Sequence, residues 1–358
     1  MNLFKNLLFK SAILSLLAFT FVSCSDDNDN DDNGPWKPSE GLYILNEGSY
    51  NGNNANLAFY NLTTQELNKE PFETMNDGLF LGSTAQHLLV QNDTMYIAVY
   101  QSAYIFVTDK YGKVIKKIES TRDGQPQQPR EFAAHGKYVY VTYYDGYLAR
   151  INKKTLEIED QVKVGSNPES VCVSNGKIYV ANSGYGYGTT VSKIDLNTFE
   201  FIKDIDVIQN PTVLEKDKDG NIYVISMGNY GDIKNTLQKI DIATEEVSVL
   251  GKGSIIRMNT KRDKLYSIYS QWGATEVTYK VYDTTTGEVV DNKFITDDVE
   301  FVSDPYSLSI DPKNGNIYIG VSNYSTESSM YIISPSTGKL LHSFKTGGIS
   351  PRGVYFIK

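Results

Sequence analysis

Short runs of alternating apolar and polar residues, divided by turns, recur along the chain from about residue 41 to its end. Successive side chains of a β-strand point to opposite faces, so this pattern predicts strands. The clearest unit lies mid-chain, where we expect strands over 167–173, 177–182, 191–196 and 199–207. Asn175-Gly176, between the first two, is a strong hairpin signal. The unit is therefore a four-stranded antiparallel sheet, whose strands we call A to D in chain order.

One tyrosine marks the B strand of each unit, inside a run rich in β-branched residues. The steps between successive tyrosines are 53, 44, 39, 44, 43 and 52 residues. These residues are Tyr43, Tyr96, Tyr140, Tyr179, Tyr223, Tyr266 and Tyr318. A period of about 45 residues with several strands per period is typical of a β-propeller. We therefore predict an all-β fold, a seven-bladed β-propeller.

The two ends of this repeat are out of phase. Most A strands follow a proline, which suits the first residue of a strand because proline lacks an N–H. The chain enters the repeat in a B strand at 41–45 and finishes in an A strand at 353–358, after Pro351. Weaker A strands are expected at 84–91 and 254–259. The C-terminal strand should therefore pair into the N-terminal blade and close a domain over 41–358, leaving no open sheet edge.

The N-terminus has the pattern of a lipoprotein signal peptide over residues 1–23. Two lysines precede an apolar stretch at 11–22, which runs into Ser23-Cys24. An N-terminal membrane anchor is the alternative, but no basic flank follows. Residues 24–40 would form a tether lipidated at Cys24, with an acidic run at 26–32. Such a run can bind calcium, although a like-charged segment without a scaffold usually stays solvated. The run resembles an acidic surface-export signal, which implies display outside the cell.

Charge and cysteine content narrow the choice of partners. The formal net charge of −9 becomes about −11 when residues 1–23, with Lys5 and Lys10, are removed. An acidic surface argues against nucleic acid and anionic membrane faces as partners. Cys172 has no partner for a disulfide if Cys24 carries lipid, and we expect it to be a small buried strand residue.

The residue constellations typical of an enzyme do not appear in the sequence. His87 and His135 fall in or near A strands, where they could approach each other in the central channel, and His342 is expected on a D strand. The structural interpretation, as partly exposed channel or turn residues, is the stronger one. Glu131, Glu169 and Asp304 are scattered carboxylates. Glu131 and Glu169, like Arg130 and Arg352, follow A-strand prolines and could be central polar contacts or strand-entry charges. No phosphate-binding loop or nucleophile elbow occurs. We therefore predict no catalytic residues, no metal and no cofactor.

One set of loops is rich in aromatic and polar residues. The B-to-C loops and the D-to-A loops lie on the same face of a four-stranded blade, because the strands alternate in direction. Tyr, Trp, Asn, Ser and Gly are the residues of adaptable binding surfaces, although single tyrosines can equally pack between blades. The candidate ligand-binding residues are Tyr50, Asn53, Asn54, Tyr100, Gln101, Arg130, Tyr144, Asp145, Asn182, Tyr185, Tyr187, Asn229, Tyr230, Gln271, Trp272, Tyr306, Asn323, Tyr324 and Arg352.

Two stretches carry family resemblances. GKIYVANSGYG, followed by KIDLNT and a proline-led strand, resembles the YncE-like, surface-layer-type seven-bladed propellers. GLYILNEGSYNGNNANLAFYN, at the start of the repeat, is similar to the opening of outer-membrane-associated propeller lipoproteins of the BtuG type. Members of that family capture corrinoids beside a TonB-dependent vitamin B12 transporter. The first resemblance implies the fold and is nearly silent on function.

Three classes of function follow. The first is a lipid-anchored protein of the cell surface and outer membrane that binds a nutrient for a TonB-dependent transporter. Within this class the resemblance favours a corrinoid as bound ligand, and a glycan is the alternative. The second class is a propeller lyase or hydrolase, which converging carboxylates or histidines would favour. The third is a protein-interaction scaffold, which a flat face would favour over a concave one.

Overall fold

The computed structural model describes residues 40–271, 276–296 and 298–357. The chain divides into two compact units, Met1–Pro35 and Trp36–Lys358, and all described residues belong to the second. The predicted signal peptide, Cys24 and Trp272 therefore lie outside the described residues. Within the described part, no helix is both long and apolar enough to cross a membrane.

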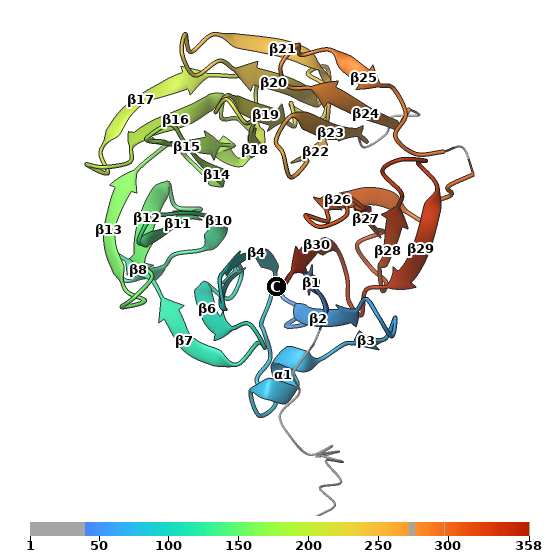
Figure 1. Cartoon of the computed structure of the whole chain (residues 1–358). Coiled ribbons are helices and arrows are strands. Elements are labelled where there is room, and N and C mark those ends of the chain that lie inside the picture. The colour runs from blue at the N-terminus through green and yellow to red at the C-terminus, as the bar shows by residue number, and fades with distance from the viewer. Residues whose placement is uncertain (1–39, 272–275, 297, 358) are drawn as a thin grey trace, which may run out of the picture. The chain divides into compact units, whose positions relative to one another are not determined.

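Seven four-stranded antiparallel sheets surround a common axis, as predicted (Figure 1). Strand A of each sheet lies innermost in the ring. The strands of each blade are given from the inner to the outer one. The first three blades are β30-β1-β2-β3 (Pro351–Phe356, Gly41–Asn46, Asn56–Asn61, Leu67–Asn68), β4-β5-β6-β7 (Ala85–Gln91, Thr94–Val99, Tyr104–Asp109, Val114–Glu119) and β10-β11-β12-β13 (Pro129–His135, Tyr138–Tyr143, Tyr147–Asn152, Ile158–Lys163). The fourth to seventh blades are β14-β15-β16-β17 (Pro168–Ser174, Lys177–Asn182, Thr190–Asp195, Phe201–Asp206), β18-β19-β20-β21 (Pro211–Lys216, Ile222–Ser226, Thr236–Ile240, Val247–Lys252), β22-β23-β24-β25 (Ile255–Met258, Lys264–Tyr269, Thr278–Asp283, Val289–Asp291) and β26-β27-β28-β29 (Asp304–Ile310, Ile317–Ser322, Ser329–Ile333, Leu340–Lys345).

The ring closes through the C-terminal strand, which confirms the prediction from the out-of-phase ends. β30 pairs antiparallel with β1, and Leu42 faces Phe356 while Leu45 faces Gly353. β30 thereby supplies the inner strand that the first blade lacks, and β1 has a partner on both sides. No edge of β1 is left open for pairing with another chain.

The repeated B-strand tyrosines join neighbouring blades. Tyr43 is fully buried on β1, and its hydroxyl donates to the carbonyl oxygen of Lys110 in the second blade at 2.9 Å. Tyr223 on β19 likewise donates to the carbonyl oxygen of Thr284 in the sixth blade at 3.3 Å. Each tyrosine combines a large apolar ring with a hydroxyl that needs a partner when buried. The tyrosine repeat therefore marks an inter-blade contact.

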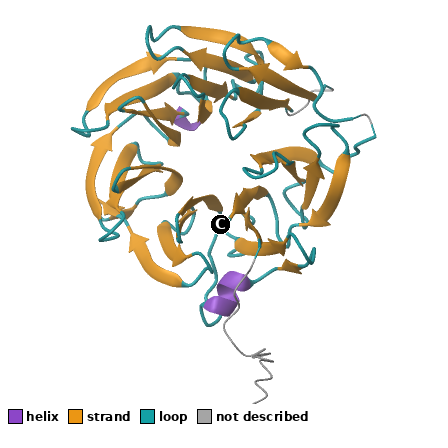
Figure 2. Cartoon of the chain, in the orientation of Figure 1, coloured by secondary structure: helices purple, strands orange, loops and turns teal. Residues whose placement is uncertain are grey.

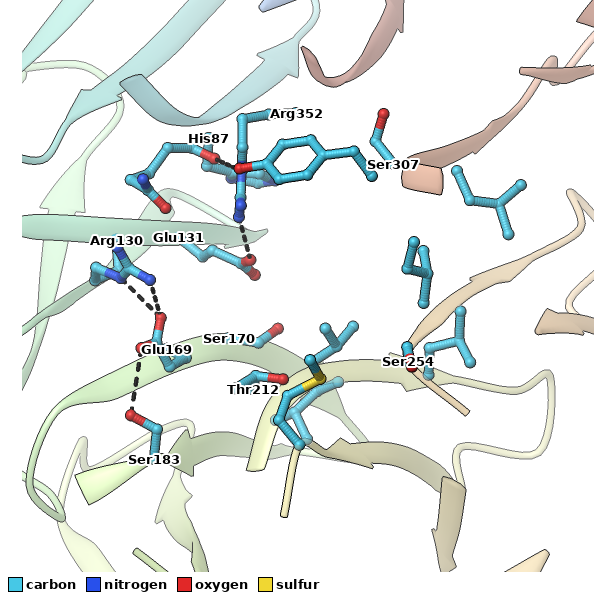
Figure 3. Close-up of a pocket in the computed structure, with 18 of the residues that line it drawn as sticks. His87, Arg130, Glu131, Glu169, Ser170, Ser183, Thr212, Ser254, Ser307 and Arg352 are labelled. Carbon is cyan, nitrogen blue, oxygen red and sulfur yellow. Dashed lines mark hydrogen bonds and ion pairs between the residues drawn. The ribbon is translucent and has the colours of Figure 1, made fainter. Parts of the chain in front are cut away.

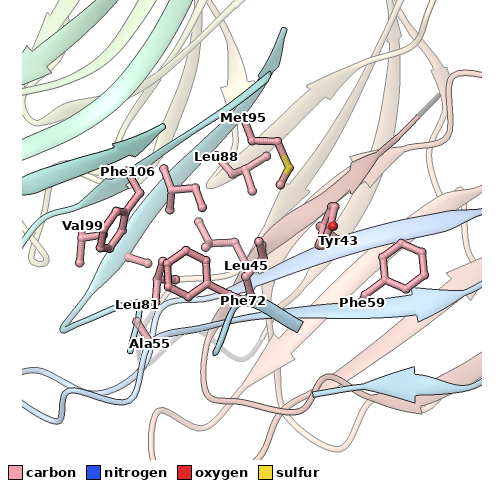
Figure 4. Close-up of a cluster of buried hydrophobic side chains, with 13 residues drawn as sticks. Tyr43, Leu45, Ala55, Phe59, Phe72, Leu81, Leu88, Met95, Val99 and Phe106 are labelled. Carbon is pink, nitrogen blue, oxygen red and sulfur yellow. The ribbon is translucent and has the colours of Figure 1, made fainter. Parts of the chain in front are cut away.

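Apolar clusters fill the spaces between blades. In the cluster between the first and second blades, Tyr43 and Leu45 pack with Leu88 and Met95 (Figure 4). All six residues of β1 are buried. The B strands read as continuous apolar runs because a sheet lies against both of their faces.

Three features were not predicted from the sequence, namely a short helix, a small hairpin and a single helical turn. Helix α1 (Pro71–Met75) follows the two-residue strand β3, and its Phe72 ring lies 5.2 Å from that of Phe106. A hairpin of β8 (Thr121–Arg122) and β9 (Gln125–Pro126) precedes the third blade. Helix η1 (Gly184–Gly186) is a single turn in the fourth blade, and strands make up nearly all remaining regular structure (Figure 2). The insertion that carries α1 accounts for the long first step in the tyrosine repeat.

Candidate functional site

A β-bulge lies near the start of six inner strands. In the second to fifth blades, the pairing of strand A with strand B shifts register just after the first paired residue, and in the seventh blade it shifts just after the second, Pro305. In the first blade, β30 shifts against β1 between Pro351 and Gly353. A bulge leaves one residue without a partner and changes the direction of its side chain. The sheets are therefore irregular at the same place around the ring.

These bulges bring one side chain per blade to a shared cavity. At each of these six shifts one unpaired residue is of interest: Gln86, Arg130, Glu169, Thr212, Tyr306 and Arg352. All six line a cavity of about 610 Å³ among the inner strands. The face is therefore hollowed at its centre. A concave site of this size is within the usual range of ligand pockets, which disfavours the flat scaffold considered above.

One polar cluster in the cavity joins the third and fourth blades. The Arg130 Nε donates to Glu169 Oε2 at 2.7 Å, and Ser183 Oγ donates to Glu169 Oε1 at 3.3 Å (Figure 3). The Arg130 guanidinium also lies 4.8 Å and 5.1 Å from the ring centres of Tyr100 and Tyr144. Burial raises the pKa of the Glu169 carboxyl, because desolvation outweighs the opposing effect of Arg130.

A second polar cluster surrounds the blade closure. Glu47 accepts a hydrogen bond from Gln86 Nε2 at 2.6 Å and another from the Tyr306 hydroxyl. Arg352 lies 3.8 Å from Glu47 Oε2 and donates through Nε to the carbonyl oxygen of Gln86 at 3.0 Å. Arg352 also lies 4.0 Å from Glu131 Oε1. These contacts join the first, second, third and seventh blades, so ring closure also completes the cavity.

The opposite side of the cavity carries its aliphatic side chains, beside polar residues such as Thr212, Ser254 and Ser307. Its apolar lining residues come from the fifth, sixth and seventh blades. They include Val213 and Leu214 of β18, Met227 after β19, Ile255 and Ile256 of β22 and Leu308 of β26. An ion pair from the same blades also lines the cavity, in which Arg257 lies 2.7 Å from Glu215 Oε1. We call the side built from the first to fourth blades the charged wall, and we call the aliphatic residues of the fifth to seventh blades the apolar wall, although the Arg257–Glu215 pair lies beside them.

Three tyrosines of the B-to-C loops stand over this cavity. Tyr185, Tyr230 and Tyr324, which we call the rim tyrosines, line it and remain 74%, 68% and 64% exposed. Their φ angles are 57°, 59° and 64°. This left-handed conformation is uncommon and costly for bulky residues, and such outliers cluster at functional sites. Positive φ angles also recur at C-to-D turns on the opposite face, as at Gln65 and Phe199, so the rim is set apart by having an exposed tyrosine at each of the three positions beside the cavity.

The cavity brings together part of the predicted site. Seven predicted residues line it, namely Arg130, Tyr144, Tyr185, Tyr230, Tyr306, Tyr324 and Arg352. Tyr100 adjoins the cavity, because its ring lies 5.4 Å from that of Tyr144. Tyr50 and Tyr187 are exposed loop residues outside the lining. Trp272 lies outside the described residues.

The other predicted polar residues lie outside the lining, and most of them hold local structure. Asn182, for example, is 2% exposed and donates to Thr190 and Ser192 on the neighbouring strand. Five other side chains accept hydrogen bonds from nearby residues in the same way. Asn54 accepts from Ser49, Asn229 accepts from Gly231 and Ile233, and Asn323 accepts from Ser325 and Thr326. Asp145 accepts from Arg122 and Gln127, and Gln271 accepts from Asn235 and Tyr269. Asn53 donates its backbone N–H to Ser83 Oγ. The Gln101 side-chain oxygen is buried without a partner among the described residues.

Several lining residues were not predicted as ligand contacts. Glu131 and Glu169 follow strand-heading prolines on this face and were considered as central polar contacts or strand-entry charges, but they were not included among the candidate ligand-binding residues. Gln86 follows Ala85 instead of a proline, so its equivalence to Arg130 was hidden. For Glu215, Arg257 and the residues of the apolar wall, the sequence predicted at most a place on or next to a strand and gave no sign that they line a cavity.

His87 lies in the cavity, as expected, in a form unsuited to binding a metal. Its Nδ1 accepts a hydrogen bond from the backbone N–H of Phe132 at 3.1 Å. The neutral ring must then carry its proton on Nε2, because one nitrogen accepts and the other donates. Metal binding would require loss of this contact or of the Nε2 proton. Among the described residues, no group of three His, Cys, Asp or Glu could hold a metal ion. His135, at the end of β10, is exposed and does not line the cavity.

We expect His87 to make stability depend on pH. Burial lowers its pKa from the ordinary 6.5 to about 4, with Arg257 and Arg352 acting in the same direction and Glu131 opposing them. Between these values the unfolded chain takes up a proton that the folded chain does not. The free energy of unfolding should therefore be full above pH 6.5 and fall by about 3 kcal/mol as the pH drops to 4.

Denaturant unfolding at pH 7 and pH 4.5 measures this effect. His87→Asn retains an acceptor for the Phe132 N–H but does not titrate, so its loss of stability on acidification should be clearly smaller than that of the parent. His135→Asn is the matched control at an exposed histidine. An unchanged pH dependence in His87→Asn would show that other groups cause the acid sensitivity.

Comparison with known proteins supports the fold. A family model described as "Domain of unknown function (DUF5074)" matches residues 40–349. No curated protein matches the chain. A quinonprotein alcohol dehydrogenase-like protein from Bacteroides thetaiotaomicron VPI-5482 shares 18% identity over 89% of this chain and 78% of its own, with a TM-score of 0.63.

Two further solved structures are similar. A putative 6-phosphogluconolactonase from Bacteroides fragilis NCTC 9343 shares 14% identity over 91% of this chain and 100% of its own, with a TM-score of 0.62. The hydrazine synthase of Kuenenia stuttgartiensis shares 20% identity over 70% of this chain and 77% of its own, with a TM-score of 0.58. At such low identity the likeness concerns the fold alone.

Proposed function

We propose that this chain, which belongs to the DUF5074 family, is a cell-surface binding protein that captures a corrinoid such as vitamin B12. It would pass the corrinoid to a TonB-dependent transporter of the outer membrane, without catalysing a reaction. Fold alone does not carry a function, so the proposal rests on the cavity and its rim, together with the resemblance of the opening segment to corrinoid-capturing lipoproteins.

The observation that carries the binding role is the rim over the cavity. Three exposed tyrosines are held in a costly backbone conformation directly over the ring of bulged side chains. Exposed rings gain little from folding, so their placement is best explained by a ligand. Tyrosine supplies a large rigid contact area at low entropic cost, and a rigid scaffold limits the ordering needed on binding.

The chemistry of the cavity suits a corrinoid. A corrin has a broad apolar ring edged by amide side arms, which both donate and accept hydrogen bonds. The apolar wall and the rim tyrosines match the ring, and the carboxylates and hydroxyls of the charged wall match the amides. A cavity of about 610 Å³ has the size of a site for a drug-sized ligand. We therefore expect only part of a corrinoid to enter, with the rest lying against the rim.

Calorimetric titration of the mature protein tests the ligand. Cyanocobalamin, cobinamide and a glycan panel should be compared, and we expect a Kd below about 1 μM, roughly −8 kcal/mol, for a corrinoid. Thr337→Ala, in the C-to-D hairpin on the opposite face, should bind like the parent. Absence of corrinoid affinity in this range would end the corrinoid assignment, and binding of a glycan instead would replace it.

The proposed location rests on the N-terminal sequence alone. Lipidation at Cys24 would anchor the protein stably, because several acyl chains on one residue bind a membrane far better than one. The acidic run at 26–32 would direct display on the outer face. Protease treatment of intact cells checks this. A variant with alanines in place of those aspartates should become protected, and equal cleavage of variant and parent would contradict an export role.

A lyase or hydrolase is the second candidate, favoured by one observation. The cavity gathers His87, Glu131 and Glu169, which the sequence left scattered. Catalysis needs a group free to exchange a proton, whereas Glu169 is held by Arg130 and the His87 Nδ1 by a backbone N–H. Product analysis after incubation with the same glycan panel tests this candidate. Turnover that is lost in Glu131→Gln would favour the enzyme over the binding protein.

A further inference from the structure

The two walls of the central cavity differ in what they leave free for a ligand. On the apolar wall, Val213, Met227 and Ile255 are only half buried, so part of each side chain still faces the cavity. A flat apolar ring placed there would remove this surface from water, which is favourable. The apolar wall therefore favours a ligand with a flat apolar ring, whatever polar groups that ring bears.

The guanidiniums of the cavity are already committed. Arg130 donates to Glu169, and Arg257 donates to Glu215 and to the carbonyl oxygen of Leu308. Arg352 donates to the carbonyl oxygen of Gln86 and faces Glu47. An anionic ligand would have to compete with these partners. The cavity is therefore a poor site for a carboxylate or phosphate.

Glu131 is the carboxylate with spare capacity to accept. Within the described residues its side chain takes part in one ion pair, with Arg352 at the long distance of 4.0 Å, and receives no hydrogen bond (Figure 3). Its side chain is 22% exposed and lines the cavity. The other carboxylates of the cavity region, Glu47, Glu169 and Glu215, each accept a hydrogen bond. An ionised carboxylate is acceptor-only, so Glu131 calls for an N–H or O–H donor.

The geometry points to Glu131 as the selectivity residue of the cavity. It accepts a hydrogen bond from the polar edge of the ligand, an ammonium or amide N–H, while an apolar ring of the same ligand lies on Val213, Met227 and Ile255. The ligand class is a flat, apolar ring that bears a hydrogen-bond donor and no carboxylate. This deepens the proposed binding role and depends on the cavity being its site, though not on the ligand being a corrinoid.

A matched series of naphthalenes tests this assignment. The probes are 2-(aminomethyl)naphthalene, 2-naphthylacetamide and 2-naphthylacetate, titrated into the mature protein by calorimetry. The rings are the same, so differences in affinity report the polar group. We expect the ammonium and the amide to bind, and the carboxylate to bind at least tenfold more weakly than the ammonium.

Two glutamine variants separate the local effect from the net charge of the protein. Glu131→Gln should reduce the preference for the ammonium over the carboxylate about tenfold. Glu288→Gln, at an exposed C-to-D turn residue on the opposite face, changes the net charge equally and should leave the preference unchanged. Met227→Gln should weaken all three probes by a similar factor, because it alters only the apolar wall. Thermal melts of each variant confirm that it is folded.

The inference is overturned if the carboxylate binds as well as the ammonium, if the two glutamine variants behave alike, or if none of the three probes binds at millimolar concentration. Failure of cyanocobalamin to bind is a separate outcome. A parent protein that selects the ammonium and amide but ignores cyanocobalamin keeps the role of Glu131 and loses the corrinoid assignment.

Discussion

Deletion of residues 351–358 is expected to abolish the cooperative thermal transition of the propeller. The deletion removes β30, which pairs with β1 over Leu42–Asn46 and places the buried Val354 in the cluster between the first and seventh blades. β1, whose six residues are all buried, would then be an open, apolar sheet edge. A propeller blade is stable only between two neighbours, so we expect the loss to spread beyond the first blade.

A circular permutant provides the control for this deletion. Phe356 faces Leu42 in the β30-β1 ladder, so a two-residue Asn-Gly turn can join β30 directly to β1 as a hairpin. The permutant would begin at Pro351 and end at Ser350, with the same strands in the same sheets. Calorimetry should show its cooperative transition restored. A deletion variant that melts like the parent would mean that β30 does not close the ring.

The fold was largely predictable because its strongest signals are local. A B strand is buried on both faces and begins near a turn, so each blade repeats one apolar run and one tyrosine. The closure was predictable for the same reason, because the local pattern shows a B strand at the start of the repeat and an A strand at its end. Helix α1 was not predicted, since five residues are too few to show a helical period. Its Phe72 is held by packing against Phe106, a contact made only in the folded ring.

The candidate site was predictable only in part, for two physical reasons. Loop composition does not separate ligand contacts from residues that hold a loop, because Asn and Asp also hydrogen-bond their own turns. Asn229 and Asn323 were predicted on composition and serve their loops. Conversely, the charged wall depends on long-range pairs. Glu47 and Tyr306 are 259 residues apart, and no local pattern places them together.

Replacing all three rim tyrosines with glycine should greatly weaken binding without lowering stability. A non-glycine residue in the left-handed region costs on the order of 1–2 kcal/mol, and glycine adopts it freely. Glycine also makes the unfolded chain more flexible, which costs roughly 0.5–1 kcal/mol per site. The rings of Tyr185, Tyr230 and Tyr324 are mostly exposed, so the main packing lost is the edge-to-face contact of Tyr324 with Tyr306, whose ring centres lie 5.5 Å apart. The triple variant should therefore melt at or slightly above the temperature of the parent.

Binding should respond in the opposite way. A few aromatic anchors usually carry most of the affinity of a site, each costing on the order of 2 kcal/mol or more on truncation. We expect the triple variant to bind cyanocobalamin at least a hundredfold more weakly in calorimetric titration.

Gln65→Gly is the matched control, since Gln65 is exposed in a C-to-D turn on the opposite face with a φ of 59°. It should change stability in the same sense and leave binding intact. A triple variant that melts several degrees lower would show that the rim tyrosines serve packing, and one that binds like the parent would show that the ligand does not contact them.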